Sequence, residues 1–176
     1  MLPLGTQLIN FDLPNTITGQ NYSSTEIASH KPILVMIICN HCPYVVHYHD
    51  ELKRLHHDFS EQISFVAISS NDVNNYPEDS PEKMKELWHE LGFSFPYLYD
   101  ETQSVAKAYQ AECTPEFYLF DAKHDLVYRG RCDSTSPKSN EQPNGEDLRA
   151  AINATINEQQ VNSEQFPSMG CNIKWK

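Results

Sequence analysis

The sequence predicts a layered α/β domain built on a mixed central sheet. Three observations support this prediction. Apolar, β-branched runs alternate along the chain with segments whose apolar residues recur at helical spacing. Two of these runs, residues 33–39 and 63–69, are largely apolar, as expected of strands buried on both faces of a sheet. The last two predicted strands follow one another directly, which favours an antiparallel hairpin beside the other strands.

Length, charge and hydropathy narrow the functional classes. The chain has 176 residues, enough for one domain with a sizeable core, and a formal net charge of -11. This charge argues against nucleic acid and anionic membranes as general partners, because both attract clustered Lys and Arg. The longest apolar run, residues 33–39, is too short to span a bilayer. The N-terminus lacks a basic segment followed by a continuous apolar one, so we expect a cytoplasmic protein.

The first half of the chain predicts an entry hairpin and a strand that leads into a helix. Residues 6–30 alternate turn signals with short apolar pieces, which is typical of a β-hairpin. Pro32 introduces the strand at 33–39, and helical spacing starts at Pro43. The apolar face predicted for this helix consists of Val46, Leu52, Leu55 and Phe59. The second buried strand follows at 63–69.

The middle of the chain predicts a capped helix and two shorter elements. After the polar loop, Ser80 has the character of an N-cap and Pro81 that of the first helical residue. The helix should end at Gly92. A short strand at 97–100 and a short helix at 101–109 follow.

The last third predicts the hairpin, a final helix and a packed tail. Residues 113–121 begin as a turn and become a strand, and residues 125–133 are the predicted hairpin partner. A final amphipathic helix should run over 146–158, after a loop rich in Pro, Ser and Asn. We assign 1–159 to the domain and 160–176 to a tail that packs on it. Its apolar residues are Phe166, Met169, Ile173 and Trp175.

Cys42 is the main candidate for reactive chemistry. A buried strand ends near Cys39 and a helix starts at Pro43, so Cys42 should be the N-cap of that helix. The unpaired N–H groups there stabilise a thiolate, and such cysteines have pKa values lowered from about 8.5 to about 3.5–7.5. His41 adds positive charge when protonated. From the residues alone, Cys39 and Cys42 remain a dithiol pair, half of a metal site, or one reactive thiol beside a bystander.

Three separated stretches resemble the thioredoxin-like superfamily. They are ILVMIICNHCPYV, CTPEFYLFD and GTQLINFDLPNTITGQ. Together with SSNDVNNYPEDSPEKMKE and the ending GCNIKW, they make residues 5–176 similar to the uncharacterised peroxiredoxin-like redoxin family of the AhpC/TSA type. This resemblance implies a thioredoxin-like three-layer fold with a mixed central sheet, an N-terminal β extension and a packed C-terminal tail.

The resemblance also implies roles for particular residues. Cys42 falls on the nucleophilic cysteine of the redox motif, whereas the second cysteine falls on Val45 and the buried acid on Met36. The nucleophile therefore lacks its usual resolving thiol. Cys113 is our first candidate for that role, because it adjoins the expected cis-proline loop. Cys39 and Cys171 are further candidate redox thiols.

The same family pattern predicts a substrate groove. It implies a cis peptide bond between Thr114 and Pro115, whose neighbouring backbone groups can pair with an extended substrate. The other residues that we assign to the groove are His41, Pro43 and Tyr44.

No metal or organic cofactor is expected. Cysteine and histidine suit zinc, but His47 and His49 lie two positions apart on a predicted helix and so point in different directions. The position of Cys42 and the family resemblance together imply a thiol-disulfide oxidoreductase that acts on a protein or small-molecule disulfide and is recycled by an external thiol. A thiol peroxidase acting on peroxide and a non-catalytic binding module are the alternatives.

Overall fold

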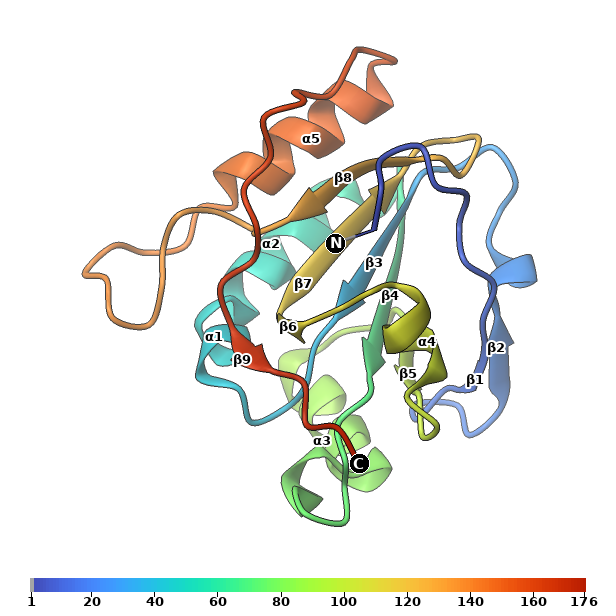
Figure 1. The fold of residues 1–176 in the computed structure, drawn as a ribbon, viewed down its shortest axis with the longest axis vertical. Coiled ribbons are helices and arrows are strands. Elements are labelled where there is room, and N and C mark those ends of the chain that lie inside the picture. The colour runs from blue at the N-terminus through green and yellow to red at the C-terminus, as the bar shows by residue number, and fades with distance from the viewer. Residues whose placement is uncertain (1) are drawn as a thin grey trace.

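A five-stranded mixed sheet forms the centre of the computed structural model, which describes residues 2–176 (Figure 1). The strand order is β5-β4-β3-β7-β8. β3, β4 and β5 are parallel to one another, β7 pairs antiparallel with β3, and β8 pairs antiparallel with β7. The bounds of these strands are β3 Ile33–Ile37, β4 Ser64–Ser69, β5 Tyr97–Tyr99, β7 Glu116–Phe120 and β8 Leu126–Gly130. The predicted mixed sheet is confirmed.

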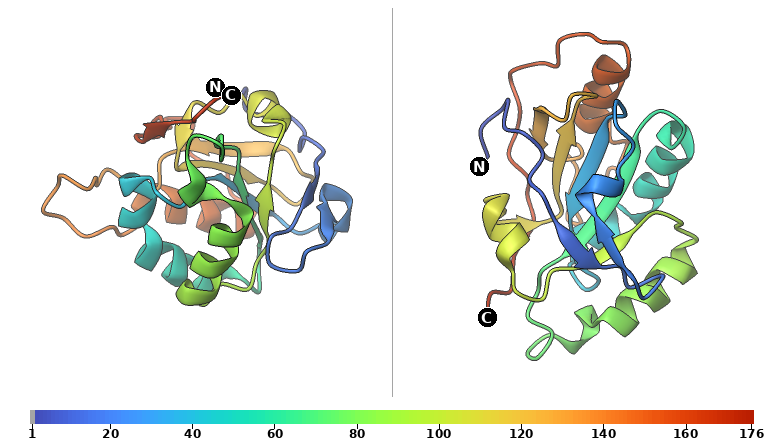
Figure 2. Two further views of the ribbon diagram at one scale, coloured as in Figure 1. Left: turned by 90° about the horizontal axis from the view of Figure 1, so that it is seen from below. Right: turned by 90° about the vertical axis from the view of Figure 1, so that its right-hand side faces the viewer.

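Helices and an N-terminal hairpin cover the two faces of this sheet (Figure 2). One apolar core joins the sheet to α2, α3 and α5, and the other joins its opposite face to α4 and β1. The helices are α1 Pro43–His47, α2 His49–Phe59, α3 Pro81–Leu91, α4 Ser104–Ala108 and α5 Glu146–Ile156. Two 3-10 turns lie at Ser24–Glu26 and Pro77–Asp79. The arrangement is a thioredoxin-like three-layer fold.

The N-terminal extension is the predicted β-hairpin. Its strands are β1 (Asp12–Pro14) and β2 (Asn21–Ser23), which pair antiparallel. Asn15 forms an isolated bridge with Leu98, and this bridge holds the hairpin against the edge strand β5.

The helix that follows Cys42 differs from the prediction in its phase. It is interrupted at Tyr48, which separates α1 from α2. Val46 is 50% exposed, so its assignment to the apolar face was wrong. Val45 and Tyr48 take the core positions instead, because residues 45, 48, 52, 55 and 59 repeat at alternating spacings of three and four. Leu52, Leu55 and Phe59 are buried as predicted.

The N-cap of α3 is as predicted and provides a test of local stability. The Ser80 side chain accepts a hydrogen bond from the Lys83 backbone N–H, Pro81 is the first helical residue, and Gly92 ends the helix in a left-handed conformation. Ser80→Ala is expected to lower the free energy of unfolding by about 1 kcal/mol, since it leaves that N–H without its cap. Urea denaturation measures the change; Ser80→Asp, which keeps an acceptor, should show little loss.

The tail returns across one end of the sheet. Residues Cys171–Asn172 form β9, which pairs antiparallel with β6 (Cys113–Thr114). Ile173 is buried in the core as expected, whereas Phe166, Met169 and Trp175 are 42%, 46% and 41% exposed and correct the prediction for them. The Arg131 guanidinium instead lies over the Phe166 ring and the Lys107 ammonium over the Trp175 ring, at 4.3 and 5.6 Å from the ring centroids.

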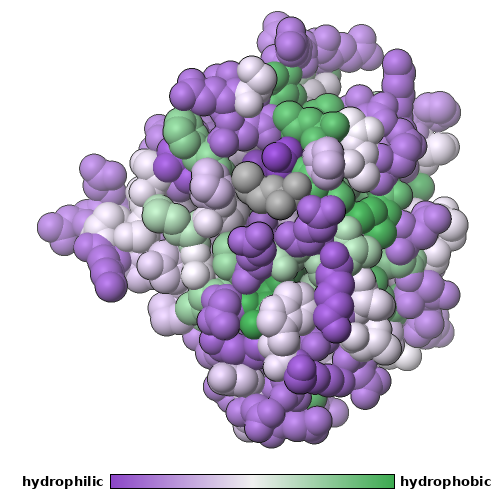
Figure 3. All heavy atoms as spheres, viewed as in Figure 1, coloured by the Kyte–Doolittle hydropathy of each residue, from purple (hydrophilic) through white to green (hydrophobic). Residues whose placement is uncertain are grey.

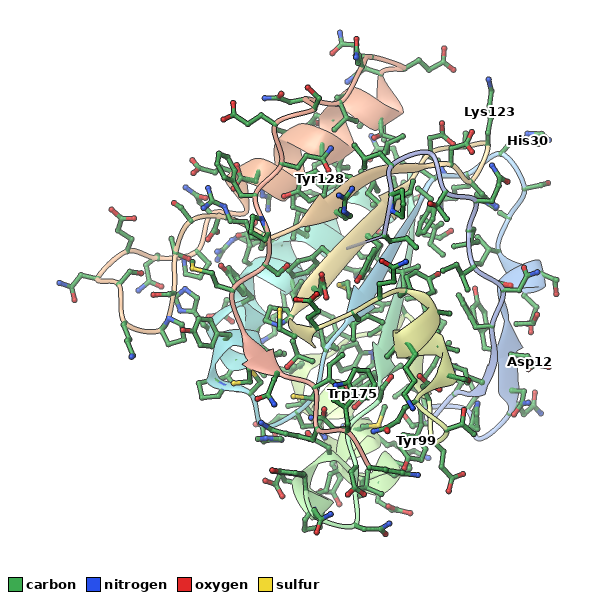
Figure 4. All side chains as sticks on the ribbon, in the orientation of Figure 1. Asp12, His30, Tyr99, Lys123, Tyr128 and Trp175 are labelled. Carbon is green, nitrogen blue, oxygen red and sulfur yellow. The ribbon has the colours of Figure 1, made fainter. Side chains whose placement is uncertain are left out.

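The outer surface of the protein is mainly hydrophilic on the face drawn in Figure 3. The face in Figure 3 carries mostly hydrophilic side chains with smaller hydrophobic groups between them. Trp175, labelled in Figure 4, lies in the lower half of that view, as β9 does in Figure 1. No helix within residues 2–176 combines the length and the apolar character that a membrane span requires.

Candidate active site

Cys42 lies between the central strand and the first helix. β3 ends at Ile37, a short loop follows, and Cys42 is the N-cap of α1 with Pro43 as the first helical residue. The sequence predicted this position because the apolar run ends shortly before a proline. Proline is favoured at the first position of a helix and disfavoured in its interior. The Cys42 side chain is fully buried. A substrate therefore reaches the sulfur only when something above it moves.

Hydrogen-bond donors surround the Cys42 sulfur. They are the side chains of Cys39, Cys171 and Thr114 and the backbone N–H of Val45. The hydrogen bond from Cys39 contributes most, and together these donors lower the pKa of Cys42 to about 4 in spite of burial, which acts in the opposite direction. In the protonated form, Cys42 donates to the Thr114 carbonyl oxygen at 3.1 Å. Because α1 has only five residues, local donors account for the shift better than a helix dipole does.

Cys39 lies two residues after the end of β3, and its side chain contacts Cys42. It is 1% exposed, and its Sγ lies 3.4 Å from the Thr114 hydroxyl. The hydrogen bond to Cys42, followed by burial, raises the pKa of Cys39 far above its ordinary value. Cys39 therefore keeps its proton and serves Cys42 as a donor. The short spacing of Cys39 and Cys42 in the sequence thus brings the two thiols into contact.

The loop of Thr114 and Pro115 contacts both Cys39 and Cys42 through Thr114. The peptide bond between these residues is cis, as the resemblance implied. Both side chains are buried. The Thr114 backbone, which the sequence assigned to substrate, is paired with Cys171 of β9.

Cys113 and Cys171 hold different places around this loop. The Cys113 Sγ faces the carbonyl oxygens of Pro115 and Ser168, at 4.0 and 3.9 Å. Burial, with the charge of Glu116, raises the pKa of Cys113 to about 12. The Cys171 thiol is instead within hydrogen-bonding reach of Cys42, and burial, with this contact, raises its pKa to about 11.

Asp79 is a site residue that the sequence analysis missed. It is fully buried, and its Oδ1 accepts hydrogen bonds from the backbone N–H groups of Asn40 (2.7 Å) and His41 (3.2 Å). Its Oδ2 contacts His41 Nδ1 at 2.6 Å and accepts from Asn71 at 2.8 Å. Asp79 thus holds the loop that ends in Cys42. It lies in a polar loop, and nothing near it in sequence signals a contact with residues 38 and 39 positions away.

The remaining predicted groove residues lie on the surface around Cys42. Pro43 is exposed, and Tyr44 and His41 are half-buried. The His41 ring stacks on Tyr76, with 5.5 Å between ring centroids. This stacking and the contact with Asp79 hold the His41 ring in place next to Cys42.

A cluster of three metal-ligating side chains occurs at this loop. Within residues 2–176, Cys39, His41 and Asp79 are the group whose donor atoms all lie within 4.8 Å of one another. The Asp79 oxygens already accept four hydrogen bonds or ring contacts. The hydrogen-bonded loop accounts for this cluster without an ion.

One protein-family model matches most of this chain. The family model described as Redoxin matches residues 3–148. The chain belongs to the redoxin family. Membership in this family supports a thioredoxin-like redox function and an oxidoreductase class of activity. No curated protein matches this redoxin.

Solved structures extend the similarity to the whole chain. An uncharacterized conserved protein from Geobacillus kaustophilus is 50% identical, with a TM-score of 0.96, over 100% of this redoxin and 94% of that chain. A hypothetical protein from Sinorhizobium meliloti 1021 is 40% identical, also at 0.96, over 100% and 96%. A thiol-disulfide oxidoreductase from Bacteroides fragilis is 20% identical, with a TM-score of 0.59, over 70% and 89%, and shares the fold alone.

Proposed function

We propose that this redoxin is a thiol-disulfide oxidoreductase in which Cys42 is the nucleophile. The observation that carries the proposal is the place of the Cys42 sulfur, among hydrogen-bond donors and opposite the Thr114 backbone. A thiolate is the attacking form of cysteine, and this set of donors stabilises a thiolate. A cytoplasmic location stays a prediction.

The proposed reaction is a thiol-disulfide exchange. The Cys42 thiolate attacks one sulfur of a protein or small-molecule disulfide, the S–S bond of that substrate breaks, and the departing thiolate takes up a proton. The product is a mixed disulfide on Cys42. A second thiol then attacks the Cys42 sulfur and releases the remaining half of the substrate. An external thiol returns the enzyme to its reduced form.

His41, Pro43 and Tyr44 are proposed to contact the substrate. They form the rim of the loop and helix start that carry Cys42. His41 is the best fixed of the three, because Asp79 and Tyr76 both contact its ring.

The pH dependence of alkylation tests the state of Cys42. The reduced protein is treated with iodoacetamide at pH values from 3 to 9, and the modified cysteines are identified by mass spectrometry. We expect the rate at Cys42 to reach half its maximum near pH 4, because its pKa is about 4, and to be constant at neutral pH. Cys113 and Cys171, with pKa values of about 12 and 11, should react only slowly throughout.

The unfolded protein provides the control for this experiment. In urea, all five cysteines should titrate near the ordinary value of about 8.5. A rate at Cys42 of the folded protein that also rises through pH 8 to 9 would contradict the proposal and favour a non-catalytic binding module. Rapid oxidation of Cys42 by peroxide, without turnover of disulfides, would favour the peroxidase alternative.

A further inference from the structure

The C-terminal tail occupies the backbone edge that an extended substrate needs. Cys171 pairs with Thr114, and Asn172 pairs with Cys113, in antiparallel register. A peptide that binds by adding a strand uses the same backbone groups. β9 therefore occupies the position that a peptide substrate of the proposed reaction would take. The strand in this position is a segment of the same chain (Figure 1).

A glycine allows the tail to come this close. A Cβ atom on Gly170 would lie 2.1 Å from the Thr114 carbonyl oxygen and 2.7 Å from its carbonyl carbon. Any other residue would force the two backbones apart. A second glycine, Gly130 at the end of β8, allows a similar close approach. A Cβ atom there would lie 2.1 Å from the Phe166 carbonyl oxygen of the tail. The chain is thus shaped at two points to receive its own tail.

Contacts on the far side of Cys171 hold the tail in register. Ile173 is 1% exposed and packs in the core between the sheet and α4, and its N–H bonds to the Glu112 carbonyl oxygen at 3.2 Å. The Lys174 carbonyl oxygen accepts hydrogen bonds from the Asp72 N–H (2.8 Å) and the Gln103 side chain (2.9 Å). These contacts fix the position of Cys171, and they must break before the tail can separate from β6.

We propose that the tail is a built-in substrate strand and that Cys171 is the resolving thiol of Cys42. This inference rests on the proposed function. The juxtaposition of the two thiols and the pairing of Cys171 with Thr114 carry it. The tail also covers Cys42, which is fully buried while Cys171 is half-buried. An external disulfide gains access when β9 lifts from β6, and the return of β9 brings Cys171 back to the mixed disulfide.

The chemistry balances with a disulfide as the oxidant. The Cys42 thiolate attacks the substrate R–S–S–R′ and releases R′–S⁻, which leaves Cys42–S–S–R. The Cys171 thiol loses its proton and attacks the Cys42 sulfur, the bond to R breaks, and R–S⁻ is released. A Cys42–Cys171 disulfide has then formed. Two electrons have passed from the two cysteines to the substrate. The proton lost by Cys171 goes to one released thiolate, and the other released thiolate takes up a proton from solvent.

The other thiols fit this role less well. Cys113, the first candidate from sequence, neighbours Thr114 on β6 and therefore projects to the other side of the strand, toward Ser168. Cys39 is close to Cys42 but sits at the end of the central strand, nearly inaccessible and strongly held in its protonated form. Among these three, Cys171 is the one on the C-terminal tail, whose strand β9 is paired only with the two residues of β6.

Peptide mapping after oxidation tests the inference. The reduced full-length protein is mixed with oxidised glutathione, quenched with an alkylating agent, digested and analysed without reduction. We expect a linked pair of peptides that contain Cys42 and Cys171. In Cys171→Ser, the mixed disulfide between Cys42 and glutathione should accumulate. In Cys113→Ser, the Cys42–Cys171 link should still form.

The outcomes separate the two proposals. A link from Cys42 to Cys113 or Cys39, or a mixed disulfide that persists in the unaltered chain, would overturn the role of Cys171 while leaving Cys42 as the nucleophile. No modification of Cys42 by glutathione would overturn both. Circular dichroism of each variant shows that it is folded before its cysteines are compared.

Gly170→Ala tests the covering role of the tail independently of its thiol. The added methyl group meets the Thr114 carbonyl oxygen, so β9 is displaced. We expect faster alkylation of Cys42 and slower formation of the Cys42–Cys171 link. Asn172→Ala is the matched control, because it changes an exposed side chain of the same strand and should leave both rates close to normal. Equal rates in Gly170→Ala and the unaltered protein would contradict the covering role.

Discussion

Cys42→Ser is expected to lower disulfide reduction to the rate of the uncatalysed exchange. A serine hydroxyl stays protonated at neutral pH, so the donors around position 42 no longer have a thiolate to stabilise. Serine is close in size to cysteine, and the fold should be retained. The measurement is the steady-state reduction of a small disulfide, with a thiol reductant in excess, for both proteins.

Cys132→Ala is the control for the loss of a thiol as such. Cys132 is fully buried after β8, and burial raises the pKa of its thiol well above the ordinary value. Its removal costs some packing but should leave turnover near normal. Turnover that survives in Cys42→Ser would refute Cys42 as the nucleophile. A binding module would show no turnover in either protein and would keep its partners in both.

Asp79→Ala is expected to destabilise the protein by about 3–5 kcal/mol and to loosen the loop before Cys42. The carboxylate is fully buried, and its loss leaves the N–H groups of Asn40 and His41 without their acceptor. Each hydrogen bond to a charged group contributes about 1.5–3 kcal/mol, and the His41 ring loses its partner as well. Urea denaturation of the reduced protein at neutral pH measures the loss.

Two further variants make this prediction specific. Glu78→Ala changes the exposed neighbour, whose backbone oxygen, rather than its side chain, accepts from Asn40; its stability should be nearly unchanged. Asp79→Asn keeps one acceptor oxygen and should lie between the two. The alkylation rate at Cys42 should follow the same order. A loss in Asp79→Ala no larger than in Glu78→Ala would show that the carboxylate does not hold this loop.

Local patterns in the sequence predicted most of the fold. The apolar run before Pro43 predicted β3, and Ser80, Pro81 and Gly92 predicted both ends of α3. These signals are local, because strand burial, capping and proline geometry depend on a few neighbouring residues. Where the local rule was ambiguous, as in the phase of the helix at Val46, packing around Tyr48 decided the outcome.

The candidate site divides in the same way. The sequence by itself determined that Cys42 caps a helix next to a buried strand, since both facts lie within ten residues of one another. Only the tertiary structure decided which groups surround its sulfur. Asp79 reaches the loop from another segment, and Cys171 returns from the C-terminal tail to pair with Thr114. Such contacts join segments that are far apart in the chain, and the local patterns of a single sequence do not show which distant segments meet.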